Sequence, residues 1–303
     1  MAISGEKVRG GGIPGGIVVE IFGPSSAGKT SILSEICASA LKRQGCVRLL
    51  DPEARIDEEY SRIFGVELDK TDYHRPDTVK EMFDLIYKWN PKEGLACNVI
   101  ATDSLAALSS KLEMSDKGDK MAGRRIAKDF NEGLRKTCRL IKKNNWLVVN
   151  TNQIRMDDTG EITPGGKGWP FYASLRIRVG PPAQDKYIKK TVKYMNKDYE
   201  RTVGIKSTCT IKKSSIGIPY RLCNVYIIFN YGIDDIRANL QYIKGITGET
   251  TYDVFDRKCR SMADAIDHIE KNNLVSDLKE RTIDYWEEIN NKFKVQRTPK
   301  VRD

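Results

Sequence analysis

The sequence predicts an α/β fold built on a mostly parallel sheet, and three observations lead to this prediction. Apolar runs of strand length occur at residues 17–22, 46–50, 98–102 and 146–150. Stretches with helical periodicity alternate with them. The runs are continuous, as expected for strands that are buried on both faces. Strands that alternate with helices in this way form parallel sheets covered by helices.

The predicted helices connect these strands. Residues 31–44 carry apolar side chains at helical spacing and stop before Gly45, a residue type that commonly ends helices. Further helical patterns cover residues 57–64, 77–89 and 123–143. Connections of this length and type are what parallel neighbouring strands require.

The pattern changes beyond Gly165. Residues 175–179 alternate like a strand with one solvated face, and residues 208–211 and 225–229 also have strand patterns. A segment rich in lysine and tyrosine, residues 184–201, precedes the last two of these strands. We therefore expect the core to end in a more irregular, more polar region.

The chain length allows one large domain with a small addition. Its 303 residues are 40% hydrophobic and 30% charged, which is typical of a soluble globular protein. From about residue 234 the pattern becomes mainly helical and ends in a basic tail. We expect two domains: a large core of residues 1–233 and a small C-terminal domain of residues 234–303.

Charge and cysteine content restrict the compartment and the partners. No apolar run could span a membrane, and the N-terminus lacks the apolar centre of a signal peptide. The seven cysteines are odd in number and form no C-x-x-C pair, which favours reduced thiols in a cytosolic protein. The net charge of +10 favours a polyanionic partner. On charge alone, a basic soluble protein without such a partner is an alternative.

The most informative motif directly follows the first predicted strand. Residues 23–30 fit the phosphate-binding pattern G-x-x-x-x-G-K-[ST] at every fixed position. In such a loop, backbone N–H groups converge on phosphate oxygens, the lysine adds a charge and the threonine hydroxyl can reach Mg²⁺. A plain turn is the alternative, but it would not need the run Gly28-Lys29-Thr30. We expect the nucleotide to contact Gly23, Pro24, Ser25, Ser26, Ala27, Gly28, Lys29, Thr30 and Ser31.

Three polar residues stand just past the ends of other predicted strands. These are Glu53, Asp103 and Gln153. Ligands of parallel sheets collect at the carboxyl ends of the strands, so we expect these residues to lie near the glycine-rich loop. There Lys29 and Mg²⁺ would offset phosphate charge, a carboxylate would orient or deprotonate water, and an amide would sense the γ-phosphate. The Mg²⁺ would be held at Thr30 and Asp103.

Several motifs together resemble the RecA family of recombinases. Their order and spacing match over roughly residues 9–180, with a weaker match to about residue 233. The resemblance implies a RecA-like phosphate-loop ATPase core with bound ATP and Mg²⁺. The motifs are Gly-Gly-Gly-Ile-Pro-Gly-Gly (10–16), the loop 23–30, Asp-Pro-Glu-Ala-Arg-Ile-Asp (51–57), Arg-Pro-Asp-Thr (75–78), Asp-Ser-Leu-Ala-Ala-Leu (103–108), Asn-Gln-Ile-Arg-Met (152–156), Gly-Gly (165–166) and Phe-Tyr-Ala-Ser (171–174).

The resemblance also implies roles for individual residues. Glu53 matches the carboxylate that activates water, Asp103 the aspartate at the Mg²⁺, and Gln153 the glutamine that reports the γ-phosphate to the DNA loops. Asp57 and Tyr60 match residues that hold the adenine. Together with Lys29, the residues Glu53 and Gln153 form the expected catalytic set.

The family also binds DNA and assembles into filaments with ATP between subunits. By resemblance, single-stranded DNA would bind two loops, at about residues 115–125 and 156–166, and duplex DNA is a further expected partner. Lys213 matches a lysine that a neighbouring subunit contributes to ATP, although Lys212 could take that place. A solvated lysine-rich loop is the alternative for the first loop. The expected DNA-binding residues are Lys117, Lys120, Arg124, Arg125, Lys128 and Arg155.

The sequence departs from the family pattern in several places. Only about nine residues precede the glycine-rich approach, where family members carry a helix and a strand that dock on the next subunit. The second DNA loop is acidic, with Asp157, Asp158 and Glu161. The tail is basic, and residues 184–201 are an insertion. These features suggest a divergent, phage-encoded member that acts in the cytoplasm of a bacterium or of an infected host.

Two functions from different classes fit these observations. The first is an ATP-dependent recombinase that coats single-stranded DNA, pairs it with homologous duplex and hydrolyses ATP when DNA is bound. The second is a DNA-binding accessory or loader that uses ATP as a conformational switch without strand exchange. A small-molecule kinase fits less well, because nothing in the sequence resembles a lid over a second substrate.

Overall fold

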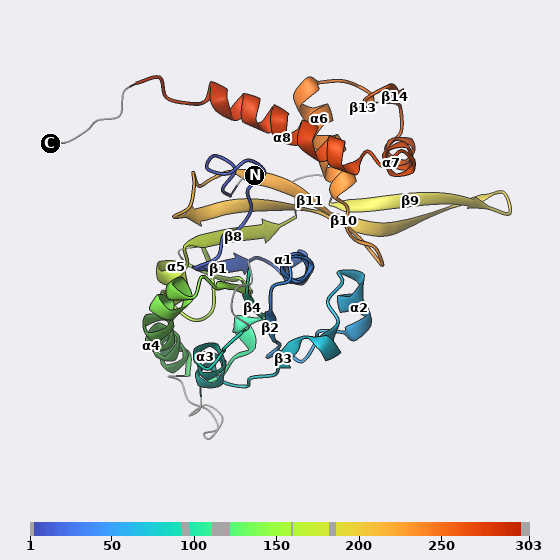
Figure 1. The fold of residues 1–303 in the computed structure, drawn as a ribbon. Coiled ribbons are helices and arrows are strands. Elements are labelled where there is room, and N and C mark those ends of the chain that lie inside the picture. Colours follow the sequence, from blue (N-terminus) through green and yellow to red (C-terminus); the bar gives the residue numbers. More distant parts are fainter. Residues whose placement is uncertain (1–2, 92–96, 111–121, 159, 182–185, 298–303) are drawn as a thin grey trace. The chain divides into compact units, whose positions relative to one another are not determined.

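The computed structural model describes residues 3–91, 97–110, 122–158, 160–181 and 186–297 (Figure 1). The chain divides into two compact units. The larger unit, the core, is Pro14–Ile233, and the smaller is Asp234–Asp303 together with Met1–Ile13. Each unit has a hydrophobic cluster of its own. No helix in the described ranges is long and apolar enough to cross a membrane.

A ten-stranded sheet, as far as the structure describes it, forms the centre of the core. The strand order is β12-β11-β10-β8-β1-β5-β4-β2-β3, and β9 pairs with β10. Strands β8, β1, β5, β4, β2 and β3 are mutually parallel. The predicted fold class, α/β with a mostly parallel sheet, is confirmed. The parallel strands are β1 (Ile17–Phe22), β2 (Val47–Leu50), β3 (Asp72–His74), β4 (Val99–Thr102), β5 (Leu147–Asn152) and β8 (Leu175–Gly180).

Helices cover both faces of the parallel strands. On one face, α3 (Val79–Tyr87) and α4 (Ala122–Lys143) lie side by side (Figure 1). The alternate strand residues, such as Val19 and Val149, point to the opposite face and are also buried. There α1 (Lys29–Lys42) packs against β5 and β4. The predicted strands therefore read as continuous apolar runs because both of their faces are buried.

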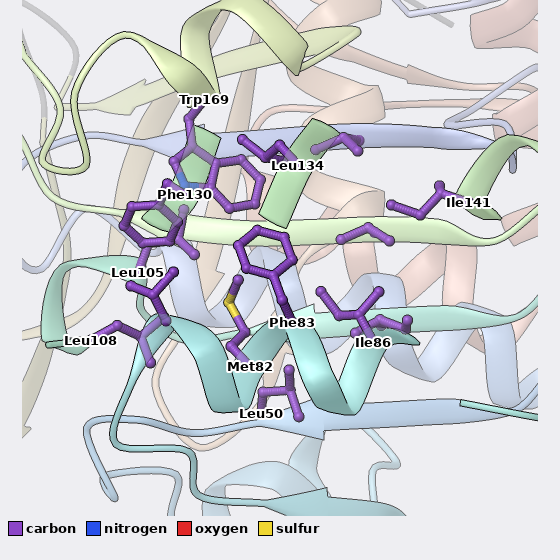
Figure 2. Close-up of a cluster of buried hydrophobic side chains, with 14 of the residues drawn as sticks. Leu50, Met82, Phe83, Ile86, Leu105, Leu108, Phe130, Leu134, Ile141 and Trp169 are labelled. Carbon is purple, nitrogen blue, oxygen red and sulfur yellow. The ribbon is translucent and has the colours of Figure 1, made fainter. Parts of the chain in front are cut away.

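The core cluster under α3 and α4 is rich in large side chains (Figure 2). Trp169 stacks on Phe83 with ring centroids 6.5 Å apart and meets the edge of Phe130 at 5.6 Å. A capping box at Thr78 and Glu81 fixes the start of α3, so its apolar face points into this cluster. Trp169 belongs to α5 (Gly168–Tyr172), which closes the cluster after the β6–β7 hairpin. That hairpin pairs β6 (Arg155–Asp157) with β7 (Gly160–Ile162).

An antiparallel extension follows β8, and it differs from the sequence-based prediction. Strand β10 (Lys197–Ser214) is much longer than the predicted strand 208–211, and β9 (Tyr187–Tyr194) was not predicted. Residues 189–202 are exposed on both faces, so they lack the apolar alternation that identifies a strand. The extension also contains β11 (Leu222–Ile228) and β12 (Gly232–Ile233), and α2 (Glu58–Ile63) completes the core.

The smaller unit surrounds a separate apolar cluster. Its elements are α6 (Asp235–Thr247), β13 (Tyr252–Val254), β14 (Arg257–Cys259), α7 (Met262–Lys271) and α8 (Val275–Lys292). The sequence led us to expect residues 1–13 in the core, but their contacts group them with this unit. The physical reason is Arg9, which lies 2.7 Å from Asp284 and from Glu287 and 3.0 Å from Glu280 on α8.

Candidate functional site

The glycine-rich loop lies between the buried strand β1 and helix α1. Its last glycine, Gly28, has a φ of +89°, which is a left-handed conformation that favours glycine. A Cβ atom on Gly28 would also lie 2.2 Å from Cδ1 of Ile227, and one on Gly23 would lie 1.8 Å from the carbonyl oxygen of Val179. Both fixed glycines of the motif are therefore required by backbone conformation or close packing.

Lys29 folds back into the curve of this loop. Its Nζ donates hydrogen bonds to the carbonyl oxygens of Gly23, at 3.0 Å, and Pro24, at 2.8 Å. Burial lowers the pKa of the Lys29 ammonium, while the nearby carboxylates of Asp103 and Glu53 oppose this shift. The cation is thus placed at the loop, with two acidic side chains close enough to affect its charge.

Asp103 connects the loop to the end of β4. Thr30 Oγ1 donates to Asp103 Oδ2 at 2.6 Å, and the Thr151 hydroxyl donates to the other carboxylate oxygen. Burial raises the pKa of Asp103, and the charges of Glu53 and Asp51 act in the same direction, whereas the two hydroxyl donors lower it. A hydroxyl and a carboxylate are hard oxygen donors of the kind that Mg²⁺ prefers.

Glu53 lies beside this pair, after the end of β2. Ser104 Oγ donates to Glu53 Oε1 at 2.5 Å, and Arg55 lies 3.1 Å from its other oxygen. The segment that carries Glu53 is held by the fully buried Asp51, whose Oδ2 accepts from the Ile56 N–H at 2.9 Å. The structure therefore brings Lys29, Thr30, Glu53 and Asp103 to one edge of the sheet.

A cavity of about 410 Å³ adjoins the loop. Its size is within the range of small-molecule sites. Tyr60 and Ser31 both line it, and their hydroxyl oxygens are 2.5 Å apart. Asp57 instead caps α2 by accepting the Tyr60 N–H at 2.8 Å. The apolar part of the lining is formed by Ile63, Phe64, Ile205, Ile227, Ile228 and Phe229.

A buried polar network that the sequence did not reveal lies behind Gln153. The preceding residue, Asn152, donates to Glu20 Oε1 at 2.9 Å and to the carbonyl oxygen of Pro164 at 3.1 Å. The completely buried Glu20 pairs with Arg176 at 2.6 Å. This network joins β1, β5 and β8 to the segment after Gln153. The available signal was a charged residue inside the apolar run 17–22, since a buried charge needs a partner.

The expected DNA-binding residues that the structure describes come from two elements. Arg124, Arg125 and Lys128 are in the first turns of α4, and Arg155 begins β6, where it is exposed. Lys117 and Lys120 are outside the described residues. The two loops to which the sequence assigned DNA binding are thus described only in part.

The acidic β6–β7 hairpin and Lys213 both have partners within the core. Arg178 donates two hydrogen bonds to Glu161, and these lower the pKa of the Glu161 carboxyl. Lys213 Nζ donates to the carbonyl oxygens of Pro170 and Phe171, each at 2.8 Å. Among the residues that the structure describes, Lys213 does not line the cavity beside the loop.

The geometry first defines a class. A glycine-rich loop leads from a buried parallel strand into a helix, and carboxylates stand at neighbouring strand ends, which is the arrangement of phosphate-loop nucleotide-binding proteins. A comparison with protein families then identifies the branch of that class. The model of the RecA N-terminal domain matches residues 5–234, so the chain belongs to the RecA family, as the sequence motifs led us to expect.

Individual curated proteins show the same likeness. Protein RecA of Treponema denticola is 32% identical over 234 residues, which cover 75% of this chain and 53% of that protein. Protein RecA of Thermus aquaticus is 33% identical over 232 residues, or 75% of this chain and 64% of that protein. Protein RecA of Rippkaea orientalis is 28% identical over 295 residues, which cover 92% of this chain and 79% of that protein. The chain therefore spans between about half and four fifths of these relatives.

Proposed function

We propose that the chain is an ATP-dependent DNA recombinase. In this proposal it binds single-stranded DNA, pairs it with homologous duplex and promotes strand exchange, and DNA stimulates its hydrolysis of ATP. The observation that carries the proposal is the convergence of Lys29, Thr30, Glu53 and Asp103 at the carboxyl edge of the sheet. Membership of the RecA family supports the assignment of DNA as the stimulating partner.

The donor atoms at this edge fit ATP and Mg²⁺. The two fixed glycines let the loop turn tightly into α1, whose positive end would face the phosphates. Thr30 and Asp103 would hold the Mg²⁺, which offsets phosphate charge when bound. No group of three or more His, Cys, Asp or Glu in the described ranges could hold a metal. Mg²⁺ commonly needs only one or two protein oxygens, with phosphates and water completing its coordination.

The residues of the chain would then each have a separate role in ATP binding and hydrolysis. Lys29 would leave the carbonyl oxygens of the loop and pair with the phosphates. Glu53 would accept a proton from the attacking water, with Ser104 fixing the carboxylate through their 2.5 Å hydrogen bond. Tyr60 and the apolar cavity wall would hold the base, and Asp57 would contribute by capping α2.

Gln153 is suited to transmit the presence of a γ-phosphate from the nucleotide site to the second expected DNA loop. It follows β5 directly, and its neighbour Asn152 is bonded to Pro164, at the end of the second expected DNA loop. A shift of Gln153 toward a bound γ-phosphate would therefore act on a segment that is anchored through Asn152 and Glu20. Lys213 would act across a subunit interface in a filament, with its carbonyl contacts as the resting position.

The accessory function remains the second candidate because of one observation. The β6–β7 hairpin carries Asp157 and Asp158. Its Glu161 accepts hydrogen bonds from the guanidinium of Arg178, a group that would otherwise be suited to bind a phosphate. A loop of this charge binds a DNA backbone poorly.

The experiment is a measurement of ATP turnover with and without single-stranded DNA, beside strand exchange between homologous DNAs. We expect turnover to rise when DNA is added and labelled strands to exchange. Stimulated turnover without exchange would favour the accessory function. If adding single-stranded DNA leaves the rate of ATP turnover unchanged, the recombinase proposal is excluded.

A further inference from the structure

The most exposed part of the core is a two-stranded ribbon formed by β9 and the first residues of β10 (Figure 1). We call residues 187–202 the ribbon. Its eight-residue strand β9 is about 26 Å long. Met195 and Asn196 form the turn with φ values of +43° and +59°, as two-residue hairpins require. Since residues 189–202 are all exposed, core packing does not dictate their side chains.

The register of the ribbon sorts its side chains into two faces. Directly opposed residues of an antiparallel pair point to the same face, and successive residues along a strand alternate between the faces. One face, the basic face, carries three cations, two tyrosines and a valine, with no acidic residue. Its opposed pairs are Tyr194 with Lys197, Val192 with Tyr199, and Lys190 with Arg201.

The other face has a balanced charge. It carries Lys189 and Lys193 together with Asp198 and Glu200. Lys189 Nζ lies 2.7 Å from Glu200 Oε1, and Lys193 is opposed to Asp198. By contrast, no ion pair within the described part of the chain engages the cations of the basic face. The difference is not needed for folding, because exposed ion pairs contribute only about 0–1 kcal/mol.

The chemistry of the basic face matches a single-stranded nucleic acid. Tyr194 and Tyr199 are 61% and 50% exposed, so their rings are accessible to unpaired bases. Grooves for single strands combine cations that follow the phosphates with aromatic rings on which bases stack. A ribbon inserted into a duplex major groove would instead bring both faces near phosphates, and Asp198 and Glu200 would be repelled there.

We propose that the basic face of the ribbon binds single-stranded DNA, as a surface additional to the α4 and β6 residues. Lys190, Lys197 and Arg201 contact phosphates, and Tyr194 and Tyr199 stack on bases. This inference rests on the proposed function only in the choice of DNA among polyanions. The ribbon would thus add a DNA contact to those that the sequence assigned to the loops following β4 and β5.

The test compares two double variants that remove the same charge from opposite faces. Lys190→Gln with Lys197→Gln alters the basic face, and Lys189→Gln with Lys193→Gln is the matched control. Binding of a fluorescein-labelled oligothymidylate is measured by anisotropy over a range of salt concentrations. Each phosphate contact on a single strand adds about 0.7 to the salt slope, so the basic-face variant should lose about 1.4 and the control almost nothing. Thermal unfolding checks that both variants are folded.

A third variant separates stacking from charge. Tyr194→Ala with Tyr199→Ala removes two stacking rings, so it should weaken binding by about thirtyfold or more and leave the salt slope unchanged. Equal slopes for the two lysine variants would overturn the proposal, as would a basic-face variant that loses affinity only for a duplex of equal length. If the basic-face variant loses the expected salt slope but DNA does not stimulate ATP turnover by the wild-type protein, the proposed function fails and the ribbon site stands. If wild-type protein binds no single-stranded DNA, both fail.

Discussion

The nucleotide edge of the sheet and the ribbon differ in how strongly packing restricts their side chains. At the edge, Gly23 and Gly28 leave no space for a side chain, and the polar groups of Thr30 and Asp103 are bonded to each other. On the ribbon, every residue from 189 to 202 is exposed and no packing restricts it. The first region is specified by geometry and the second by charge. Substitutions in the first region should therefore change stability, nucleotide binding and turnover, and those in the second should change DNA affinity and its dependence on salt.

The largest effect should come from breaking the buried ion pair behind the nucleotide edge. Glu20→Gln leaves the charge of Arg176 without its partner in the interior, which costs about 3–5 kcal/mol. The matched control is Glu200→Gln on the ribbon, whose exposed pair with Lys189 should change stability by less than about 1 kcal/mol. Urea unfolding of both variants measures the difference. Similar losses of unfolding free energy in the two variants would show that the two regions do not differ in this way.

A smaller but more specific effect is expected for the lysine of the loop. Lys29→Ala removes the cation that the loop carbonyls hold in place. The phosphates of the nucleotide would then lack a charged partner, and such a loss in a desolvated pair costs about 2–5 kcal/mol. Nucleotide affinity should therefore fall about a hundredfold. Lys189→Ala on the balanced face of the ribbon is the control and should leave nucleotide affinity unchanged. Titration calorimetry with a non-hydrolysable ATP analogue compares them. Undiminished affinity of the Lys29 variant would place the nucleotide elsewhere.

The smallest effect concerns the β6–β7 hairpin, which lies between the two regions in the sequence. Arg178 lowers the pKa of Glu161, so the stability from this pair is present above the unfolded value of about 4.3 and is lost as the pH falls through the lower folded value. Arg178→Gln should raise the Glu161 pKa and cost less than about 1 kcal/mol at neutral pH. Carbon-detected NMR titration follows the carboxyl directly. An unchanged pKa in the variant would show that the pair does not hold the hairpin.

The parts of the molecule that the sequence predicted are those in which one local requirement dominates. The strands around residues 17–22 and 98–102 were found because burial on both faces demands apolar side chains. The loop 23–30 was found because phosphate binding fixes residue types at fixed spacing. The end of β2 could likewise be placed before Glu53, and the structure puts Glu53 beside Ser104 and Asp103.

The parts that were missed depend on contacts between residues that are distant in sequence, or on exposure. Glu20 and Arg176 meet only because β1 and β8 are neighbours in the sheet. Arg9 joins residues 1–13 to α8 through an ion pair that no local pattern indicates. Strand β9 was missed because an exposed ribbon has no apolar alternation. Its two chemically different faces become visible only once the register is known.

The account depends most on the role of Glu53 at the nucleotide edge, and one variant tests that role directly. Glu53→Gln keeps the shape of the side chain and the neighbouring Lys29 and Thr30, but it cannot accept a proton from water. ATP binding and ATP turnover are measured on the same preparation, with single-stranded DNA present. We predict unchanged affinity and a turnover reduced by about 10²–10⁴-fold. Turnover close to that of the wild type would contradict the assignment of Glu53 and, with it, the proposed catalytic site.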